Sequence, residues 1–82
     1  MLPNRLNQVR VRANFPGEVE LLVRKGERIH AGQAMVVIEG VGELERLAAR
    51  NPGTIAEVHV RTGQEVEQGA LLLVLQEELP AG

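Results

Sequence analysis

The chain has 82 residues, of which 44% are hydrophobic and only 1% aromatic, and its formal net charge at pH 7 is −2. This length fits one domain, and the apolar content is too high for a disordered segment. Phe15 is the single aromatic residue, so we expect a core built from aliphatic side chains.

The composition also argues against several classes of partner. A negative net charge and the lack of aromatic stacking platforms argue against binding to nucleic acid. The chain has no cysteine, which excludes disulfides, thiolate metal sites and a cysteine nucleophile. The longest apolar run, Ala70 to Leu75, is far shorter than the roughly 20 residues of a membrane span. The N-terminus has no apolar stretch typical of a secretion signal, so we expect a soluble, cytoplasmic protein with no membrane partner.

In the first half of the chain, strand-like segments alternate with turn signals. Residues 1–7 are polar and are expected to form a flexible segment before a domain at 8–76. The alternation of apolar and polar residues predicts a strand at Gln8–Ala13, and further strands are expected at Val19–Val23 and over the apolar run Ala34–Ile38. Asn14–Gly17 is a turn signal, and glycines at 26 and 32 predict two further turns.

The second half begins with a glycine-rich stretch. Gly40 and Gly42 flank one valine, and this predicts a tight hairpin because glycine reaches positive φ without steric cost. Leu44–Ala49 contains good helix formers, so a helical turn is an alternative there, but its short length and the hairpin favour a strand. Further strands are expected at Thr54–Val60, with an irregularity near Ala56, and at Leu71–Leu75. Residues 77–82 are expected to be a flexible tail.

The two halves of the chain repeat one another. Pro16-Gly17 recurs as Pro52-Gly53 at an offset of 36, and Gly26 and Gly32 recur as Gly63 and Gly69 at an offset of 37. Matched glycines predict matched turns, and the apolar runs between them predict matched core strands. The expected fold is therefore all-β, a flattened barrel or sandwich of two four-stranded halves related by a pseudo-twofold axis.

Few side chains are arranged for chemistry. His30 and His59 fall at non-equivalent points of the two repeats, which favours two exposed histidines over a metal site. Glu39, Glu43 and Glu45 surround the predicted hairpin, where a solvated acidic rim, or a contact with a partner, is favoured over a catalytic cluster. The sequence contains no catalytic triad, phosphate-binding glycine loop or metalloprotease motif. We expect neither a metal nor enzymatic activity.

Four stretches carry a family resemblance: F-P-G-E-V, V-R-K-G-E-R-I-H-A-G-Q, V-V-I-E, and P-G-T-I-A-E-V-H-V-R-T-G-Q-E-V-E-Q-G. They span about Ala13 to Leu75, and they resemble the biotinyl/lipoyl carrier domain family. The Ile-Glu pair before the hairpin is more similar to the biotinyl branch than to the lipoyl branch. The resemblance implies the same barrel fold.

The resemblance also implies where a cofactor would be attached. Carriers of biotin or lipoate hold it on one lysine at the tip of the central hairpin, in the biotinyl branch within A-M-K-M after Ile-Glu. Alignment with that motif places Gly40, Val41, Gly42 and Glu43 at its four positions, so that Gly42 occupies the lysine position. Lys25, the single lysine of the chain, lies in the first half. The resemblance thus implies a degenerate attachment hairpin, with no cofactor and no cofactor-binding residue.

Three functions stay open at this point. The favoured one is a non-catalytic relative of biotin carboxyl carrier proteins that acts as a protein-interaction or assembly module. Its partner would be a carboxylase- or dehydrogenase-type complex, or a second copy of the chain. The alternatives are a structural spacer of the membrane-fusion or transport type and a true biotin carrier. The missing lysine argues against a true carrier, for which modification of Lys25 would be the remaining route.

Overall fold

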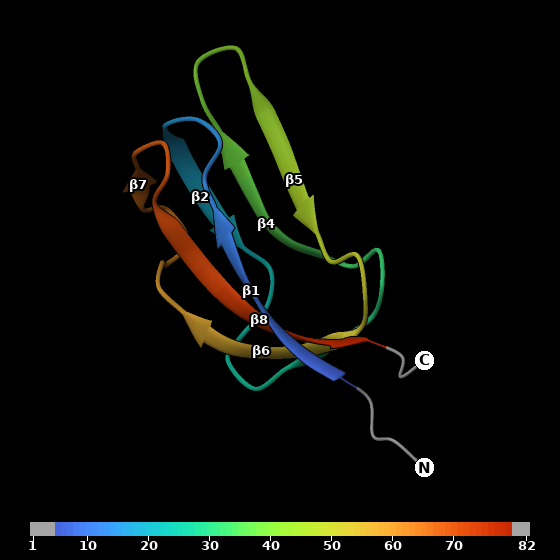
Figure 1. Cartoon of the computed structure of the whole chain (residues 1–82). Helices are drawn as coiled ribbons and strands as arrows, with labels where there is room; N and C mark the ends of the chain where they lie inside the picture. Colours follow the sequence, from blue (N-terminus) through green and yellow to red (C-terminus); the bar gives the residue numbers. More distant parts are fainter. Residues whose placement is uncertain (1–4, 80–82) are drawn as a thin grey trace.

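The computed structural model describes residues 5–79, which form two four-stranded antiparallel sheets (Figure 1). The strands are β1 (Arg5–Arg12), β2 (Gly17–Leu21), β3 (Arg28–Ile29), β4 (Ala34–Glu39), β5 (Leu44–Ala48), β6 (Gly53–Val58), β7 (Glu65–Val66) and β8 (Leu71–Leu79). One sheet has the order β1-β8-β6-β3 and the other the order β5-β4-β2-β7. The all-β fold class predicted from the sequence is confirmed. Within residues 5–79, no helix is long and apolar enough to cross a membrane.

Each sheet combines strands from both halves of the chain, and the glycine turns of one half are hydrogen-bonded to residues in, or directly after, strands of the other half. The N–H groups of Gly26 and Gly63 donate to the carbonyls of Ile55 (2.7 Å) and Val19 (2.8 Å), and those of Gly32 and Gly69 donate to Ala49 (2.7 Å) and Ala13 (2.8 Å). All four glycines have φ between 85° and 92°, the left-handed region that favours glycine. The two halves therefore make matching hydrogen bonds and interlock.

The core between the sheets is aliphatic, as the composition predicts. Its largest fully buried side chains are Ile29, Ile38, Ile55, Leu72, Leu73, Leu75, Val19 and Val36. On β2 the neighbours of Val19, Glu18 and Glu20, are exposed, which is the period of two that a half-buried strand requires. Burying each such side chain stabilises the fold by roughly 1.5–3 kcal/mol.

Two finer predictions are confirmed. Leu44–Ala48 is a strand rather than a helical turn, because its backbone pairs with β4 from Glu39↔Leu44 to Ala34↔Ala48. The irregularity expected near Ala56 is a register shift between Ile55 and Glu57 in the pairing of β6 with β8.

The outer strands are longer than predicted. β1 begins at Arg5 and β8 continues to Leu79, and the two are paired from Arg5↔Leu79 through Asn7↔Glu77. The structure therefore corrects the flexible segments expected at 1–7 and 77–82 for residues 5–7 and 77–79. The predicted strands ended where the apolar residues end, whereas the backbone pairing of β1 with β8 continues past them. The rest of those two segments, 1–4 and 80–82, lies outside the described residues.

Candidate functional site

The β4–β5 hairpin projects from one end of the molecule, away from the start of β1 and the end of β8 (Figure 1). Glu39 and Leu44 form its last strand pair. Beyond them, the Gly40 N–H donates to the Glu43 carbonyl at 2.8 Å, which closes a tight turn. The four residues that the family resemblance singles out therefore form one structural unit.

Val41 and Gly42 are the tip of this turn. Val41 is 100% exposed, and Gly42 has a φ of 73° with nothing within 4 Å of the position a Cβ would occupy. A side chain at residue 42 would point into open space. Neither tip residue has an amine, the group that an amide link to a carboxylic cofactor requires.

Gly40 is needed for a different reason than the sequence suggests. Its φ is not positive, so conformational freedom does not explain it. A Cβ at residue 40 would lie 2.8 Å from the Pro16 carbonyl oxygen and 2.9 Å from Cδ1 of Phe15. The base of the hairpin is therefore packed directly on the turn between β1 and β2.

The acidic rim expected at the hairpin is only partly a cluster. Glu39 and Glu43 are exposed, whereas Glu45 is half-buried and accepts a hydrogen bond of 2.7 Å from Nδ2 of Asn14. Two shallow hollows flank the hairpin, and their lining includes four carboxylates that the sequence did not single out: Glu18, Glu20, Glu65 and Glu67. Only the pairing of β7 with β2 brings the last two to this end, and no local pattern predicts that pairing.

Two apolar side chains stand within this acidic surface. Val41 is 100% and Leu44 71% exposed, the two highest values among the large hydrophobic residues that the structure describes as exposed. We call these two residues and the carboxylates Glu18, Glu39, Glu43, Glu65 and Glu67 the hairpin face.

The remaining sequence candidates lie apart from the hairpin. His30 is exposed in the turn after β3, and His59 lies with Nε2 2.7 Å from Oε1 of Glu57. In the part of the chain that the structure describes, no group of three or more His, Asp or Glu side chains is placed to hold a metal. Lys25 is exposed in the turn before β3. The N–H of the next residue, Gly26, is hydrogen-bonded to β6, which belongs to the sheet that does not contain the hairpin. The single lysine is therefore not a tip residue.

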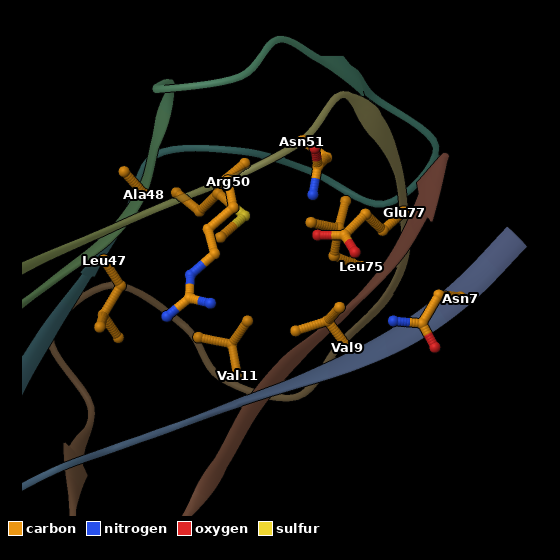
Figure 2. Close-up of a pocket in the computed structure, with 11 residues that line it drawn as sticks. Asn7, Val9, Val11, Leu47, Ala48, Arg50, Asn51, Leu75 and Glu77 are labelled. Carbon is orange, nitrogen blue, oxygen red and sulfur yellow. The ribbon is translucent and has the colours of Figure 1, made fainter. Parts of the chain in front are cut away.

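A pocket that no sequence pattern indicates lies between β1 and β5 and is lined in part by Glu77, Arg50 and Asn51 (Figure 2). Two of these residues fall in segments expected to be a turn or a tail, where a pocket wall has no sequence signal.

The two interlocked sheets with a glycine hairpin at one end are the architecture of a biotinyl/lipoyl-type domain. The family model described as "Biotin-requiring enzyme" matches residues 9–75. The chain therefore belongs to the biotin/lipoyl family.

Two relatives in sequence are carboxylase proteins. The chain is 30% identical over 74 residues to pyruvate carboxylase of Bacillus subtilis, which covers 89% of this chain but 6% of that protein. It is also 30% identical over 60 residues to the biotin carboxyl carrier protein of acetyl-CoA carboxylase from Solanum lycopersicum, covering 73% of this chain and 86% of the relative. The chain thus spans a small part of the first relative and most of the second.

Solved structures of carboxylases share the fold. A single-chain, multi-domain long-chain acyl-CoA carboxylase superposes with a TM-score of 0.77 at 31% identity, over 85% of this chain and 7% of that one. Kluyveromyces lactis urea carboxylase superposes with a TM-score of 0.71 at 20% identity, over 84% and 6% of the two chains. At 20% identity the second likeness concerns the fold alone.

Proposed function

We propose that this chain is a non-catalytic biotinyl/lipoyl-type module that carries no cofactor and docks on another protein. The observation that supports this most directly is the hairpin tip, where Val41 and Gly42 stand in place of an amine-bearing residue. Covalent attachment through an amide needs a nucleophilic amine at the tip. Lys25 offers one only in the connection between β2 and β3, outside the hairpin.

The hairpin face is the surface proposed for docking. Exposed apolar side chains rimmed by charged ones are typical of protein interaction sites. A partner complementary to Val41 and Leu44 and to the surrounding carboxylates would present an apolar patch flanked by Lys or Arg. We prefer a carboxylase-type partner to a dehydrogenase-type complex or a second copy, because the relatives described above are carboxylases.

The absence of a cofactor is tested by intact mass. The chain is co-expressed with a biotin ligase, and separately with a lipoate ligase, each with its cofactor supplied. We expect the unmodified mass in both cases. A clean increase by one cofactor would overturn the proposal.

A gain-of-function pair then tests whether residue 42 is the lost attachment position. Gly42→Lys, alone and with Val41→Met and Glu43→Met, is expected to become a substrate of the biotin ligase, because a side chain there meets open space. The positive φ makes lysine at this position unfavourable by about 1–2 kcal/mol, which a folded domain tolerates. Val41→Lys is the matched control, since it places the same amine one residue away. Biotinylation of the control but not of the Gly42 variants would contradict the assignment of residue 42.

Docking is tested separately with a purified biotin carboxylase subunit from the same organism. Leu44→Asp and Val41→Asp are expected to weaken binding at least tenfold in surface plasmon resonance. Leu22→Asp serves as the control, because Leu22 is 42% exposed but lies at the end of β2 remote from the hairpin, where its N–H bonds to Met35. Equal losses in all three variants would contradict a specific hairpin face.

A further inference from the structure

Among the strands that the structure describes, β1 has the longest open edge. It lies at the end of the β1-β8-β6-β3 sheet, so one side of its backbone is paired with β8 and the other has no described strand beside it. The other outer strands are shorter, with five residues in β5 and two each in β3 and β7. The pairing of β1 with β8 is regular from Arg5↔Leu79 to Val11↔Leu73. An open, regular edge of this kind is a template on which a further strand can pair.

The backbone groups at this open edge belong to the even-numbered residues of β1. On β8 the Glu78 N–H donates to the Pro52 carbonyl at 2.8 Å, so the even-numbered residues of β8 face the β6 side. Because backbone groups alternate along a strand, the odd-numbered residues of β8 face β1 and pair there with odd-numbered residues such as Val9. The N–H and C=O groups of Gln8 and Arg10 therefore point away from the sheet.

The side chains of the same even-numbered residues carry positive charge on the outer surface of the sheet. Gln8, Arg10 and Arg12 are all exposed. Arg12 donates to the Gly69 carbonyl at 3.0 Å, and within residues 5–79 neither arginine forms an ion pair with a carboxylate. On β8 the residue opposite Arg10 is Val74, which is apolar. Acidic side chains on an added strand would therefore be complementary to this edge.

The odd-numbered residues give the inner side of this edge an apolar character. Val9 and Val11 are half-buried and line the pocket between β1 and β5 together with Leu47. Figure 2 shows both valines directed into the pocket. A strand added beside β1 places every second side chain on this side of the sheet, next to the two valines. Apolar side chains are therefore favoured there.

We propose that the edge of β1 binds an extended segment of another protein in which acidic and β-branched residues alternate. The backbone of this segment bonds to Gln8 and Arg10 and adds a further strand to the sheet. Its carboxylates lie beside Arg10 and Arg12. Its β-branched side chains lie on the other face, beside Val9 and Val11. Strand addition of this kind draws its affinity from backbone hydrogen bonds and its specificity from alternate side chains.

A second copy of the chain does not fit this edge. Two antiparallel β1 strands would pair through Gln8 and Arg10 of each copy, so the arginines of both copies would lie on one surface, where like charges are destabilising. The charge thus favours a different, acidic chain. The edge of β1 is separate from the hairpin face, and binding there does not depend on the function proposed for that face.

The binding test uses the whole ¹⁵N-labelled chain at pH 7 and low salt, titrated with the peptide acetyl-GEVEVEG-amide. We expect saturable shifts of the backbone amides at residues 7–12, and none with acetyl-GKVKVKG-amide, in which lysine replaces glutamate. Hydrogen exchange gives a sharper readout. The amides of Gln8 and Arg10 should exchange at least tenfold more slowly in the complex, whereas those of Val9 and Val11 are already protected by β8. No saturable shift, or shifts without slower exchange at residues 8 and 10, would overturn the proposal.

Two variants test the charge and the backbone separately. Arg10→Glu reverses the charge on the edge, so affinity for the acidic peptide should fall at least tenfold and the lysine peptide should bind instead. Gln8→Pro removes an N–H that faces away from β8, so it should weaken binding while the pairing with β8 remains. Arg46→Glu is the matched control, because Arg46 lies 36 residues after Arg10, at the equivalent position of β5, and is also exposed. It should bind the acidic peptide as the parent chain does.

Two further results would contradict the assignment. Equal losses in Arg10→Glu and Arg46→Glu would show that net charge, and not the edge of β1, attracts the peptide. Shifts of the amides at residues 7–12 with protein concentration, in the absence of any peptide, would show that a second copy occupies the edge. The dispersion of the same spectra shows whether each variant is folded, and Arg10→Glu decides the outcome where Gln8→Pro does not fold.

Discussion

At the scale of single residues, Gly17 and Gly53 each allow a close approach between two backbone segments of the same half of the chain. A Cβ at Gly17 would lie 2.4 Å from the Glu39 carbonyl oxygen, and one at Gly53 would lie 2.3 Å from the Gln76 carbonyl oxygen. Both oxygens belong to paired strands, so neither can shift without breaking a ladder. Gly53→Ala should therefore lower the free energy of unfolding by about 3 kcal/mol in urea denaturation, with a similar loss in Gly17→Ala.

The control for this prediction is Gly42→Ala. Its Cβ meets nothing within 4 Å, so only the positive φ disfavours alanine, by about 1 kcal/mol. A loss in Gly53→Ala no larger than that in Gly42→Ala would show that the backbone relaxes and that close approach is not limiting.

Of the two hairpin glycines, the sequence predicts the role of one and not of the other. Spacing alone predicted a tight turn and a residue with positive φ, and Gly42 is that residue. The reason for Gly40 was not predictable, because the Phe15 ring that contacts it is brought there by packing between distant segments. Glu65 of β7 and Glu67 directly after it were not predicted at the hairpin face for the same reason.

At the scale of elements, one ion pair ties the two-residue edge strand β3 to β8 across β6. Nη2 of Arg28 donates to Oε1 of Glu78 at 2.8 Å. The hydrogen bond from Arg28 lowers the pKa of Glu78, and the same bond raises the pKa of Arg28. A carboxyl group with a lowered folded-state pKa stabilises the fold above its unfolded value of about 4.3, and this contribution is lost as the pH falls through the lowered value.

Glu78→Gln should accordingly be less stable than the parent chain at pH 6, and the difference should vanish as the solution becomes strongly acidic. Urea unfolding across this pH range measures it, and because both side chains are solvent-accessible the difference should be small and should shrink in high salt. A difference that persists unchanged at pH 2 would contradict the ion pair as its source.

Strand β8 was predicted only in part. Apolar residues, alternating on β2 and β6 and continuous on β4 and the first part of β8, located these strands, because their inner faces form the core. Glu77 and Glu78 have no such pattern and were assigned to a tail, although their backbones complete the ladder with β1. Burial of Glu77 could not be expected either, since charged side chains are rarely buried without a partner.

At the scale of the whole molecule, the two halves share one arrangement of interlocked strands, but the residues that fill the two ends differ. The matched glycine hydrogen bonds keep the frame alike in both halves. One end is closed by Phe15 against Gly40 and presents the hairpin face. At the other end the repeat offsets of 36 and 37 place Asn51 and Glu77 at the corresponding positions, and a pocket is open there. Glu77 leaves the arrangement of the strands unchanged but places a largely buried carboxylate in the structure, which lowers stability. Functional sites often lower stability in this way.

The pocket residue Glu77 can be tested for its effect on the stability of the fold. Glu77→Leu should raise the free energy of unfolding by about 1 kcal/mol, because a leucine at this largely buried position adds apolar contact with the Val9 and Leu75 lining of the pocket. The measurement is urea unfolding at pH 7. Glu65→Leu is the control, since Glu65 is exposed and its replacement should change stability by no more than about 0.5 kcal/mol. A loss of stability in Glu77→Leu would show instead that the carboxylate has a partner in the free protein, and Arg50 at the mouth of the pocket would be the residue to replace next.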